Sequence, residues 1–261
     1  MHFSIRVAAL SILSTLSFWH VFAIPDVAPL GQHASTPKRS FDSWVSVGHN
    51  GHWPCTFEQL DAIDIAVEYT KLLASAAIVA LDHAGTRSTA YLRWFGKNNT
   101  SESDRLSIKT NHYDAVISQL RGPDSGTVKS IEEGGPNPKR LVYACPAASS
   151  PLCSNKVAAS VINFGDEGFK VNLLYVCPPF FQSVSYHKSL YDWQWGRYTP
   201  SAGMILLHEM QHLDAVVGAD RRSFDHAYSV SDCEHLDDSD KLTNAQNYAF
   251  FALDVNARPP K

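Results

Sequence analysis

Net charge, long hydrophobic runs and repetition are all scarce in this chain of 261 residues. A formal net charge of −4 offers no basic surface for nucleic acid or for an anionic membrane. Beyond the N-terminal segment, no run is apolar enough to suggest a membrane-spanning helix, and we find no internal repeat. With 44% hydrophobic and 18% charged residues, the composition fits an ordinary globular protein of one or two domains.

The N-terminus has the pattern of a secretory signal peptide. Arg6 precedes an apolar run over residues 7–18, and Val21-Phe22-Ala23 fits a cleavage site of small residues. The run is too short for a membrane-spanning helix. We therefore expect residues 1–23 to be a signal peptide, and the protein to be secreted and extracellular.

Residues 24–54 are rich in Pro, Ser, Gly and His and have no periodic apolar pattern. We expect a flexible leader or a short pro-segment here, with Lys38-Arg39 as a dibasic pair that a processing protease could cut. The remaining residues, 55–261, contain no linker and are expected to form one domain.

Five cysteines follow the signal segment, and an oxidising compartment would pair four of them. They are Cys55, Cys145, Cys153, Cys177 and Cys233. Their spacing alone does not determine which residues pair. Asn98 and Asn99 both stand in overlapping acceptor sequences for N-linked glycans, of which we expect at most one to be occupied.

The most informative motif is His208-Glu209-Met210-Gln211-His212. On a helix, its two histidines lie one turn apart on the same face, where both imidazoles can bind one zinc ion. Glu209 would then be placed to deprotonate a water molecule at the metal. This arrangement is typical of a metallopeptidase site.

The surroundings of the motif favour a buried helix. Ser201 can serve as the N-cap and Gly218 as the C-cap glycine, with apolar residues between them. We therefore expect one helix over residues 201–218. Buried histidine and glutamate side chains need polar partners, and a metal ion would supply them.

The rest of the chain predicts helices first and strands later. The helical ranges are 57–82, which begins with a Thr56/Gln59 capping box, 88–95, 103–121 and 241–256. The strand ranges are 141–145, 157–164 and 169–177, with a hairpin at residues 163–170. This order implies an α+β fold, mostly helical, with a small antiparallel or mixed sheet beside the histidine-bearing helix.

Two other features are interpreted as structural. His112 lies in the predicted helix 103–121 without a second ligand nearby, so we expect a buried structural histidine. The aromatic segment 186–198 could line a substrate cleft, but a packed loop is the favoured interpretation.

A catalytic zinc ion needs a third protein ligand, and the spacing leaves several candidates. Ala215 and Gly218 occupy the positions where a metzincin would have glycine and histidine, which excludes that class. Glu234 would suit a site of the thermolysin type. Asp220 and Asp225 compete as an aspartate that follows the helix.

At this point the sequence resembles a known family, the aspzincin metallopeptidases, which include deuterolysin and peptidyl-lysine endopeptidases. The resemblance rests on the motif above, on Ser223-Phe224-Asp225-His226-Ala227-Tyr228, which is similar to Gly-Thr-x-Asp-x-x-Tyr-Gly, and on the segment 244–249. Three cysteine-bearing segments, 143–145, 152–154 and 175–177, are also similar. The resemblance covers roughly residues 55–255 and implies a zincin-like fold.

The resemblance implies a role for each site residue. Zinc, one ion, would be bound by His208, His212 and Asp225, with Glu209 as general base. Tyr228 would donate a hydrogen bond to the oxyanion that forms at the peptide carbonyl. It also implies the disulfides Cys55–Cys145 and Cys153–Cys177, leaving Cys233 unpaired.

This chain departs from the family pattern at four positions. Arg222 and Ser229 replace the glycines that flank the third-ligand motif, and Ser223 replaces its threonine. Gln246 is neutral where lysine-cleaving members have an aspartate after Asn-Ala, so a preference for lysine is not expected.

We therefore expect a secreted zinc endopeptidase that acts as a monomer on proteins or peptides, with no nucleic acid or membrane partner. The alternative is a secreted zinc-binding or host-interaction protein of the same fold, without catalytic turnover. A carbohydrate-binding strip at Trp193 and Trp195 is a third, weaker interpretation.

Overall fold

The computed structural model describes residues 41–124 and 126–259. The predicted signal peptide, the leader up to residue 40 and the dibasic pair Lys38-Arg39 lie outside the described residues. Within the described ranges, no helix combines the length and the apolar character that crossing a bilayer requires.

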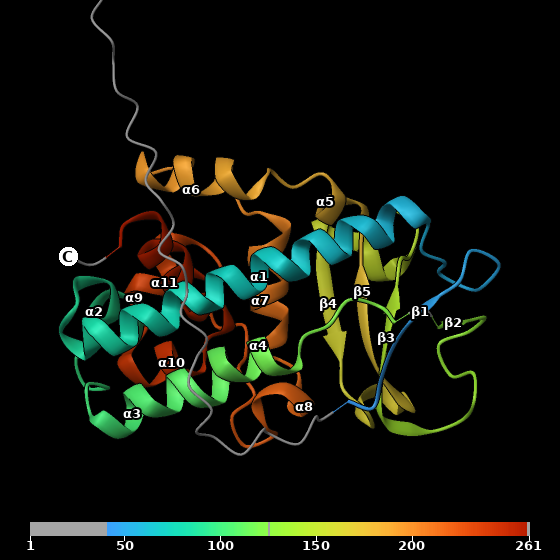
Figure 1. Ribbon diagram of the computed structural model, residues 1–261, viewed down its shortest axis with the longest axis horizontal. Helices are drawn as coiled ribbons and strands as arrows, with labels where there is room; N and C mark the ends of the chain where they lie inside the picture. Colours follow the sequence, from blue (N-terminus) through green and yellow to red (C-terminus); the bar gives the residue numbers. More distant parts are fainter. Residues whose placement is uncertain (1–40, 125, 260–261) are drawn as a thin grey trace, which may run out of the picture. The chain divides into compact units, whose positions relative to one another are not determined.

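A mixed sheet of five strands lies beside the helices, in the order β2-β1-β3-β5-β4 (Figure 1). The strands are β1 (Ser43–Val47), β2 (Thr127–Val128), β3 (Asn137–Ala144), β4 (Ala159–Ile162) and β5 (Val171–Val176). β1 pairs in parallel with β2 and β3, and β3 with β5, whereas β4 pairs antiparallel to β5. The predicted hairpin is therefore present, and β4 is an edge strand.

Strand β1 differs from the expectation of a flexible leader over residues 24–54. Residues 43–47 pair with β3, and the side chains of Trp44 and Val47 are buried on opposite faces of the sheet. Five residues are too few to show the alternation of apolar and polar side chains that indicates a strand, although Trp and Val favour strands. The folded unit begins before residue 55, where we had expected its boundary.

Side chains alternate across the central strands, as the pleat requires. Leu141 and Tyr143 of β3 join the main core between sheet and helices, while Val142 and Ala144 join a smaller cluster on the other face. β5 is buried along its whole length. The sheet is thus held between two apolar layers, and the larger layer supports the site.

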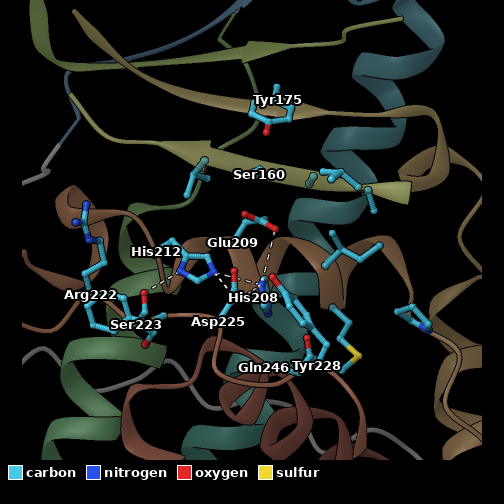
Figure 2. Close-up of a pocket in the computed structure, with 18 of the residues that line it drawn as sticks. Ser160, Tyr175, His208, Glu209, His212, Arg222, Ser223, Asp225, Tyr228 and Gln246 are labelled. Carbon is cyan, nitrogen blue, oxygen red and sulfur yellow. Dashed lines mark hydrogen bonds and ion pairs between the residues drawn. The ribbon is translucent and has the colours of Figure 1, made fainter. Parts of the chain in front are cut away.

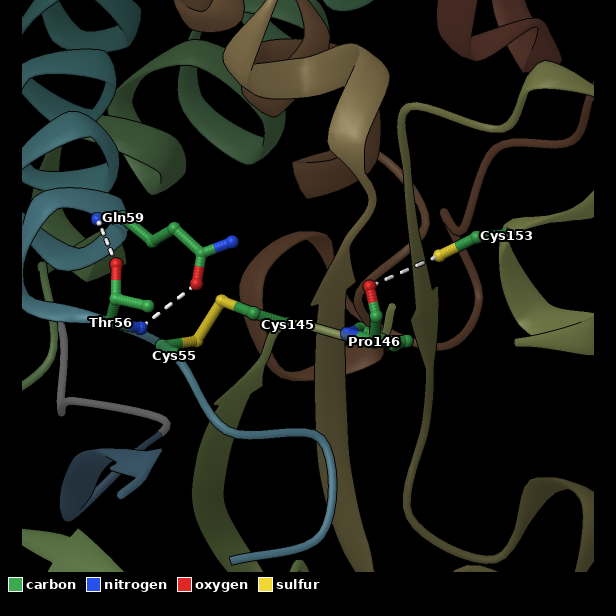
Figure 3. Close-up of a disulfide and its surroundings, with 6 residues drawn as sticks. All are labelled: Cys55, Thr56, Gln59, Cys145, Pro146 and Cys153. Atoms are coloured by element: carbon green, nitrogen blue, oxygen red, sulfur yellow. Dashed lines mark hydrogen bonds between the residues drawn. A yellow bond between two sulfur atoms is a disulfide. The ribbon is translucent and has the colours of Figure 1, made fainter. Parts of the chain in front are cut away.

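The longest helix, α1 (Phe57–His83), has the predicted start. Thr56 Oγ1 accepts from Gln59 N, and Gln59 Oε1 accepts from Thr56 N at 2.8 Å, so the capping box is confirmed. Immediately before the cap, Cys55 is bonded to Cys145 at the end of β3 (Figure 3). This disulfide ties the start of α1 to the sheet.

The second disulfide joins Cys153 to Cys177 at the end of β5. Cys233 is free and buried. Both pairs are those that the family resemblance implied.

Most of the remaining helices are short. Before the hairpin they are η1 (Gly85–Arg87), α2 (Thr89–Phe95), α3 (Glu102–Ser107), η2 (Ile108–Asp114), α4 (Ala115–Gln119) and η3 (Pro151–Lys156). Within and after it they are η4 (Asp166–Gly168), α5 (Pro178–Phe181), α6 (Tyr186–Gln194), α7 (Ala202–Met210), α8 (Asp214–Val217), α9 (Val230–His235), α10 (Asp238–Thr243) and α11 (Ala245–Ala257). The predicted helix 103–121 corresponds to α3, the π-helical η2 and α4, while the predicted helix 241–256 is divided at Asn244.

The aromatic segment 186–198 is packed, but mostly as helix α6 and not as a loop. Trp193 is 4% exposed, and its Nε1 donates to Asp254 Oδ1 at 2.8 Å. Trp195 is 67% exposed. The interpretation of Trp193 and Trp195 as a carbohydrate-binding strip is therefore wrong, because it needs both indole rings at the surface.

Helix α7 packs against α1 and α11 and lies next to β4. Ser201 caps it as predicted, since its hydroxyl accepts from Met204 N. Gly203 allows the close approach to α1, because a Cβ atom there would lie 2.8 Å from Tyr69 Cβ. The α+β fold with a small mixed sheet beside this helix is confirmed.

Candidate active site

The histidine-bearing helix is shorter than the sequence predicted. α7 ends at Met210, and His212 lies in the turn that follows, before α8. The carbonyl groups of Gln211 and His212 accept from Ser223 N and Asn163 Nδ2, both at 2.9 Å, and not from the next helical turn. These two bonds to distant segments explain why the expected continuous helix 201–218 breaks here.

The same turn fixes the orientation of the His212 ring. Its Nδ1 donates to the Ser223 carbonyl at 2.9 Å, so a neutral imidazole has its lone pair on Nε2. Asn163 also accepts from Asp214 N at 2.8 Å and thereby connects the end of β4 to both sides of the turn. A backbone carbonyl partner of this kind orients a histidine for metal binding.

Three ligand atoms converge at the end of α7 (Figure 2). His208 Nε2 lies 3.2 Å from His212 Nε2, and Asp225 Oδ1 lies 3.2 Å from the first and 3.3 Å from the second. His208 and His212 come from the helix and the turn after it, whereas Asp225 comes from the loop between α8 and α9. No other group of three such ligands occurs within residues 41–124 and 126–259.

This triangle fits a zinc ion. Ligand atoms about 2.0–2.1 Å from a tetrahedral ion are about 3.3 Å apart, close to the three distances in the protein. Two imidazole nitrogens and one carboxylate oxygen are also donors that zinc commonly takes. The three side chains therefore have the separation and the chemistry that one zinc ion requires.

The charges within the triangle support one another. Burial raises the pKa of Asp225, but hydrogen bonds from His208 and His212 outweigh it, and the net pKa lies well below the ordinary value. Burial lowers the pKa of His212, but its contacts with Asp225 and Glu209 raise it overall. Asp225 is thus ionised at neutral pH, as a metal ligand must be.

Glu209 lies on α7 beside the triangle, and its carboxyl group points toward β4 (Figure 2). Its Oε1 is 4.0 Å from His208 Nε2, and the residue is buried. Burial raises the pKa of this carboxyl group, opposed by the two imidazoles. A raised carboxyl pKa suits a group that accepts and returns a proton near neutral pH.

Tyr228 lies on the opposite side of the triangle from β4 (Figure 2). Its ring is stacked near that of His208, with centroids 5.9 Å apart, and the residue is 59% exposed. Burial of the hydroxyl and its hydrogen bond to Asp225 raise the pKa of Tyr228 well above the ordinary value. The hydroxyl therefore keeps its proton and can donate it in a hydrogen bond.

A cleft of about 730 Å³ contains all five of these residues. One wall is the edge strand β4 with the residues on either side of it, and the floor is α7. Around the ligands, the lining also includes Ser160, Tyr175, Tyr198, Pro200, Met204, Ile205, Arg222, Phe224 and Gln246. A cleft beside an unpaired strand edge suits an extended peptide, which could hydrogen-bond to that edge.

The other candidate third ligands lie elsewhere. Glu234 is bonded to Arg93, and Asp220 pairs with Arg221 at 2.7 Å. Gln246 lines the cleft and donates from Nε2 to the Tyr198 hydroxyl at 3.1 Å, so this part of the wall is polar and uncharged.

Sequence reasoning missed residues that hold the ligands from a distance. Asn163 was assigned only to the hairpin, and Ser223 was noted only as a substitute for threonine. Asn244 was noted only within a similar segment, but its amide contacts the loop that carries Asp225. A buried asparagine at the end of an element is the only local signal for such roles.

His112 is a buried structural histidine, as expected. Its Nδ1 donates to Gln211 Oε1 at 2.8 Å, and its Nε2 lies 3.2 Å from the Tyr248 hydroxyl. Burial lowers its pKa to about 4, so the ring is neutral at pH 7.

Comparison with known proteins agrees with this geometry. Residues 80–253 match the aspzincin family described as lysine-specific metallo-endopeptidase. A neutral protease 2 homologue from Uncinocarpus reesii is 23% identical over 225 residues, which cover 86% of this chain and 52% of that protein. A second homologue, MEP5 of Coccidioides posadasii, is 36% identical over 56 residues, covering 22% and 15%. This chain therefore spans about half the length of the first of these relatives.

The fold is similar to that of a zinc peptidase from Grifola frondosa, with a TM-score of 0.51 and 17% identity. The similarity covers 77% of this chain and 98% of that one. The family match covers about two thirds of the sequence and includes the residues that converge in the cleft. The chain belongs to the aspzincin metallopeptidase family.

Proposed function

We propose that the protein is a zinc-dependent endopeptidase that hydrolyses internal peptide bonds. One observation carries the proposal: His208, His212 and Asp225 converge within 3.3 Å of one another, with Glu209 beside them in a cleft bordered by a free strand edge. Binding zinc alone would need neither the glutamate nor the cleft.

His208, His212 and Asp225 would hold one zinc ion. When bound, zinc polarises a peptide carbonyl and makes water easier to deprotonate. The hydrogen bond from His212 Nδ1 to Ser223 keeps Nε2 free for the ion. His208 Nδ1 is buried without a hydrogen-bond partner among the described residues, so packing of α7 keeps this ring in place.

Glu209 acts as general base and then as general acid. Its carboxylate takes a proton from the water that attacks the peptide carbonyl, and later gives that proton to the leaving amine. Tyr228 donates its phenolic hydrogen to the oxyanion that develops on the carbonyl oxygen. The raised pKa of Tyr228 keeps its hydroxyl protonated, and the raised pKa of Glu209 makes its carboxylate a stronger base.

The substrate is an extended segment of a protein or peptide that lies along β4. The neutral Gln246–Tyr198 pair in the cleft supports a preference for uncharged or apolar side chains at this position over lysine. Met204 and Pro200 contribute apolar lining on the same cleft. Cleavage of a peptide library, read by mass spectrometry, would test this preference.

The protein is expected to act as a secreted, extracellular monomer. Two disulfides support an oxidising compartment. Expression of the full chain in a fungal host tests secretion, with the medium analysed for the protein and its N-terminal residue. Size-exclusion chromatography with light scattering tests the monomer.

Glu209→Gln tests the catalytic proposal, because it removes the base and keeps a side chain of similar size. We expect zinc content to be retained and casein hydrolysis to fall by about 10²–10⁴-fold. The alternative, a zinc-binding or host-interaction protein without turnover, predicts that the wild type also fails to cleave casein. Wild-type rates in the Glu209→Gln variant would contradict the mechanism.

A further inference from the structure

We propose that Asn244 is a positioning residue for the zinc site, because its buried amide sets the conformation of the loop that carries Asp225 and Tyr228. The inference rests on the proposed function, since it gives Asn244 a part in zinc binding through Asp225. Asn244 itself makes no contact with the three ligand atoms.

Both polar atoms of the amide bind the loop directly after Asp225. Oδ1 accepts from His226 N at 2.9 Å and from Ala227 N at 3.2 Å. Nδ2 donates to the Ala227 carbonyl at 3.1 Å. The backbone of the two residues between Asp225 and Tyr228 is thus bound by a single side chain.

The backbone on both sides of Asn244 holds the residue directly before Asp225. Phe224 N donates to the Thr243 carbonyl at 2.7 Å, and Ala245 N donates to the Phe224 carbonyl at 2.9 Å. Asp225 therefore lies between two fixed points, Phe224 and Ala227. Its carboxylate has little freedom to leave the triangle while these bonds hold.

Asn244 is itself firmly held. It is completely buried, and Nδ2 also donates to Asn247 Oδ1 at 2.7 Å and lies 3.4 Å from Cys233 Sγ. Only an amide offers an acceptor and two donors at this point. An aspartate would place a second oxygen against the oxygens of Ala227 and Asn247, and an apolar residue would leave buried backbone groups unpaired.

A simple helix-capping role does not explain these contacts. Asn244 is the N-cap residue of α11, where an asparagine side chain would ordinarily accept from the first turn of the helix. Its side chain makes no such bond. The amide is turned toward the 224–228 loop instead, so its polar contacts serve the loop.

Asn244→Ala tests this role, with Asn256→Ala as the matched control. Asn256 is also an asparagine of α11, but its Nδ2 donates to the Tyr186 hydroxyl and not to the loop or to Asn244. Zinc affinity is measured by competition with a chelator, and the melting temperature is measured on the metal-free protein. We expect both variants to melt earlier, but only Asn244→Ala to bind zinc about 10–100-fold more weakly.

A double-mutant cycle with Asp225→Ala separates positioning from general destabilisation. If Asn244 acts through Asp225, Asn244→Ala has no further effect on zinc affinity once the carboxylate is gone. Equal zinc affinity in the Asn244→Ala and Asn256→Ala variants would overturn the inference, as would an undiminished effect in the Asp225→Ala background.

Two further results distinguish a wrong ligand set from a wrong role for Asn244. If Asp225→Ala leaves zinc affinity unchanged, the proposed ligand set is wrong, and the role of Asn244 falls with it. If Asn244→Ala does not fold, Asn244→Asp replaces it, since it keeps an acceptor for the two loop N–H groups and loses the donor to Ala227. The same loss of zinc affinity is expected, and an unchanged affinity would overturn the role.

A separate observation supports a second inference. We infer that Asn98, and not Asn99, carries the N-linked glycan when the chain passes through a secretory compartment. Asn99 Nδ2 donates to the carbonyls of Phe95 and Asp238 at 2.6 and 2.5 Å, so its amide is occupied by the fold. Asn98 is exposed, and in the part of the chain that the structure describes only its backbone N–H is bonded, to Asp238 Oδ2 at 2.8 Å.

The attachment would proceed on a lipid-linked oligosaccharide pyrophosphate as donor. Asn98 Nδ2 forms the bond to the anomeric carbon of the sugar, the bond from that carbon to the pyrophosphate oxygen breaks, and the lipid pyrophosphate leaves. The amide loses one proton to the transferase base. At Asn99 the same bond would displace the two contacts that tie the 96–101 loop to Phe95 of α2 and to Asp238 of α10.

Four variants of the full chain, secreted from a eukaryotic host, test this assignment by their mass before and after a peptide-N-glycosidase. Asn98→Gln and Thr100→Ala remove the Asn98 acceptor and leave Asn99-x-Ser101 intact. Asn99→Gln and Ser101→Ala do the reverse. We expect one glycan in the wild type, in Asn99→Gln and in Ser101→Ala. We expect none in Asn98→Gln and in Thr100→Ala. A glycan retained in Asn98→Gln, or none in the secreted wild type, would overturn the inference.

Discussion

The candidate site is built from two regions that are held in different ways. His208 and Glu209 lie on α7, which is buried between α1, α11 and β4, and packing fixes them. Asp225 and Tyr228 lie on an exposed loop, which hydrogen bonds from Asn244 fix. The site thus joins one ligand held by helix packing, His208, to two ligands held by long-range hydrogen bonds, His212 in the turn after α7 and Asp225 in the loop.

Among the variants that test this difference between α7 and the loop of Asp225 and Tyr228, the largest effect is expected from a change in the loop. Tyr228→Phe removes the phenolic donor and keeps the ring beside His208. We expect kcat to fall by about 10²–10³-fold, because the oxyanion loses a hydrogen bond, with KM and zinc content nearly unchanged. An equal rise in KM with unchanged kcat would mean that the loop contributes only substrate binding.

The next effect concerns the support behind α7, where His112 binds Gln211. Its pKa is about 4 in the folded protein and near 6.5 when unfolded, so the unfolded chain takes up the proton first as the pH falls. Stability should therefore be lost between about pH 6.5 and pH 4, by up to about 3 kcal/mol. Urea unfolding of the metal-free protein measures this loss, and His112→Gln should flatten it. An equally steep pH profile in that variant would exclude His112 as the source.

Asn163→Ala tests the turn where the two regions meet. The variant loses the bonds to the His212 carbonyl and to Asp214 N. We expect zinc affinity to fall by about 10–100-fold, as for other residues that orient ligands. Ser223→Ala is the control, since its hydroxyl has no hydrogen-bond partner within residues 41–124 and 126–259 and only its carbonyl binds His212. Equal zinc affinities would show that the turn holds without Asn163.

The smallest effect is expected at the start of α7. Ser201→Ala removes the N-cap and should lower the free energy of unfolding by about 1 kcal/mol. Packing should still hold the helix in place, so zinc affinity and kcat should stay close to the wild type. A large loss of zinc affinity here would show that the helix is less firmly packed than its burial indicates.

Local pattern was sufficient for much of the fold. The capping box at Thr56, the helix that follows it and the β4–β5 hairpin depend on neighbouring residues, and each was predicted from them. The disulfide pairs were not deducible from spacing and came from the family resemblance. The early strand β1 was missed because five residues, paired with partners almost a hundred positions away, carry too little pattern.

The site likewise contains features that neighbouring residues predict and features that depend on distant parts of the sequence. The spacing of His208 and His212 predicted a shared metal, but it did not predict the break of the helix at residue 211, because Asn163 and Ser223 cause that break from elsewhere in the sequence. Spacing also left Glu234, Asp220 and Asp225 open as third ligands. Only the folded loop brings Asp225 to the two imidazoles, and the role of all three as zinc ligands remains a prediction.

Metal content measured together with casein hydrolysis on the same preparations tests the central claim most directly. The wild type should contain one zinc per chain and be active, Asp225→Ala should lose both, and Asp220→Ala should keep both because its carboxylate pairs with Arg221 at the surface. Full zinc content and activity in Asp225→Ala, or their loss in Asp220→Ala alone, would contradict the account.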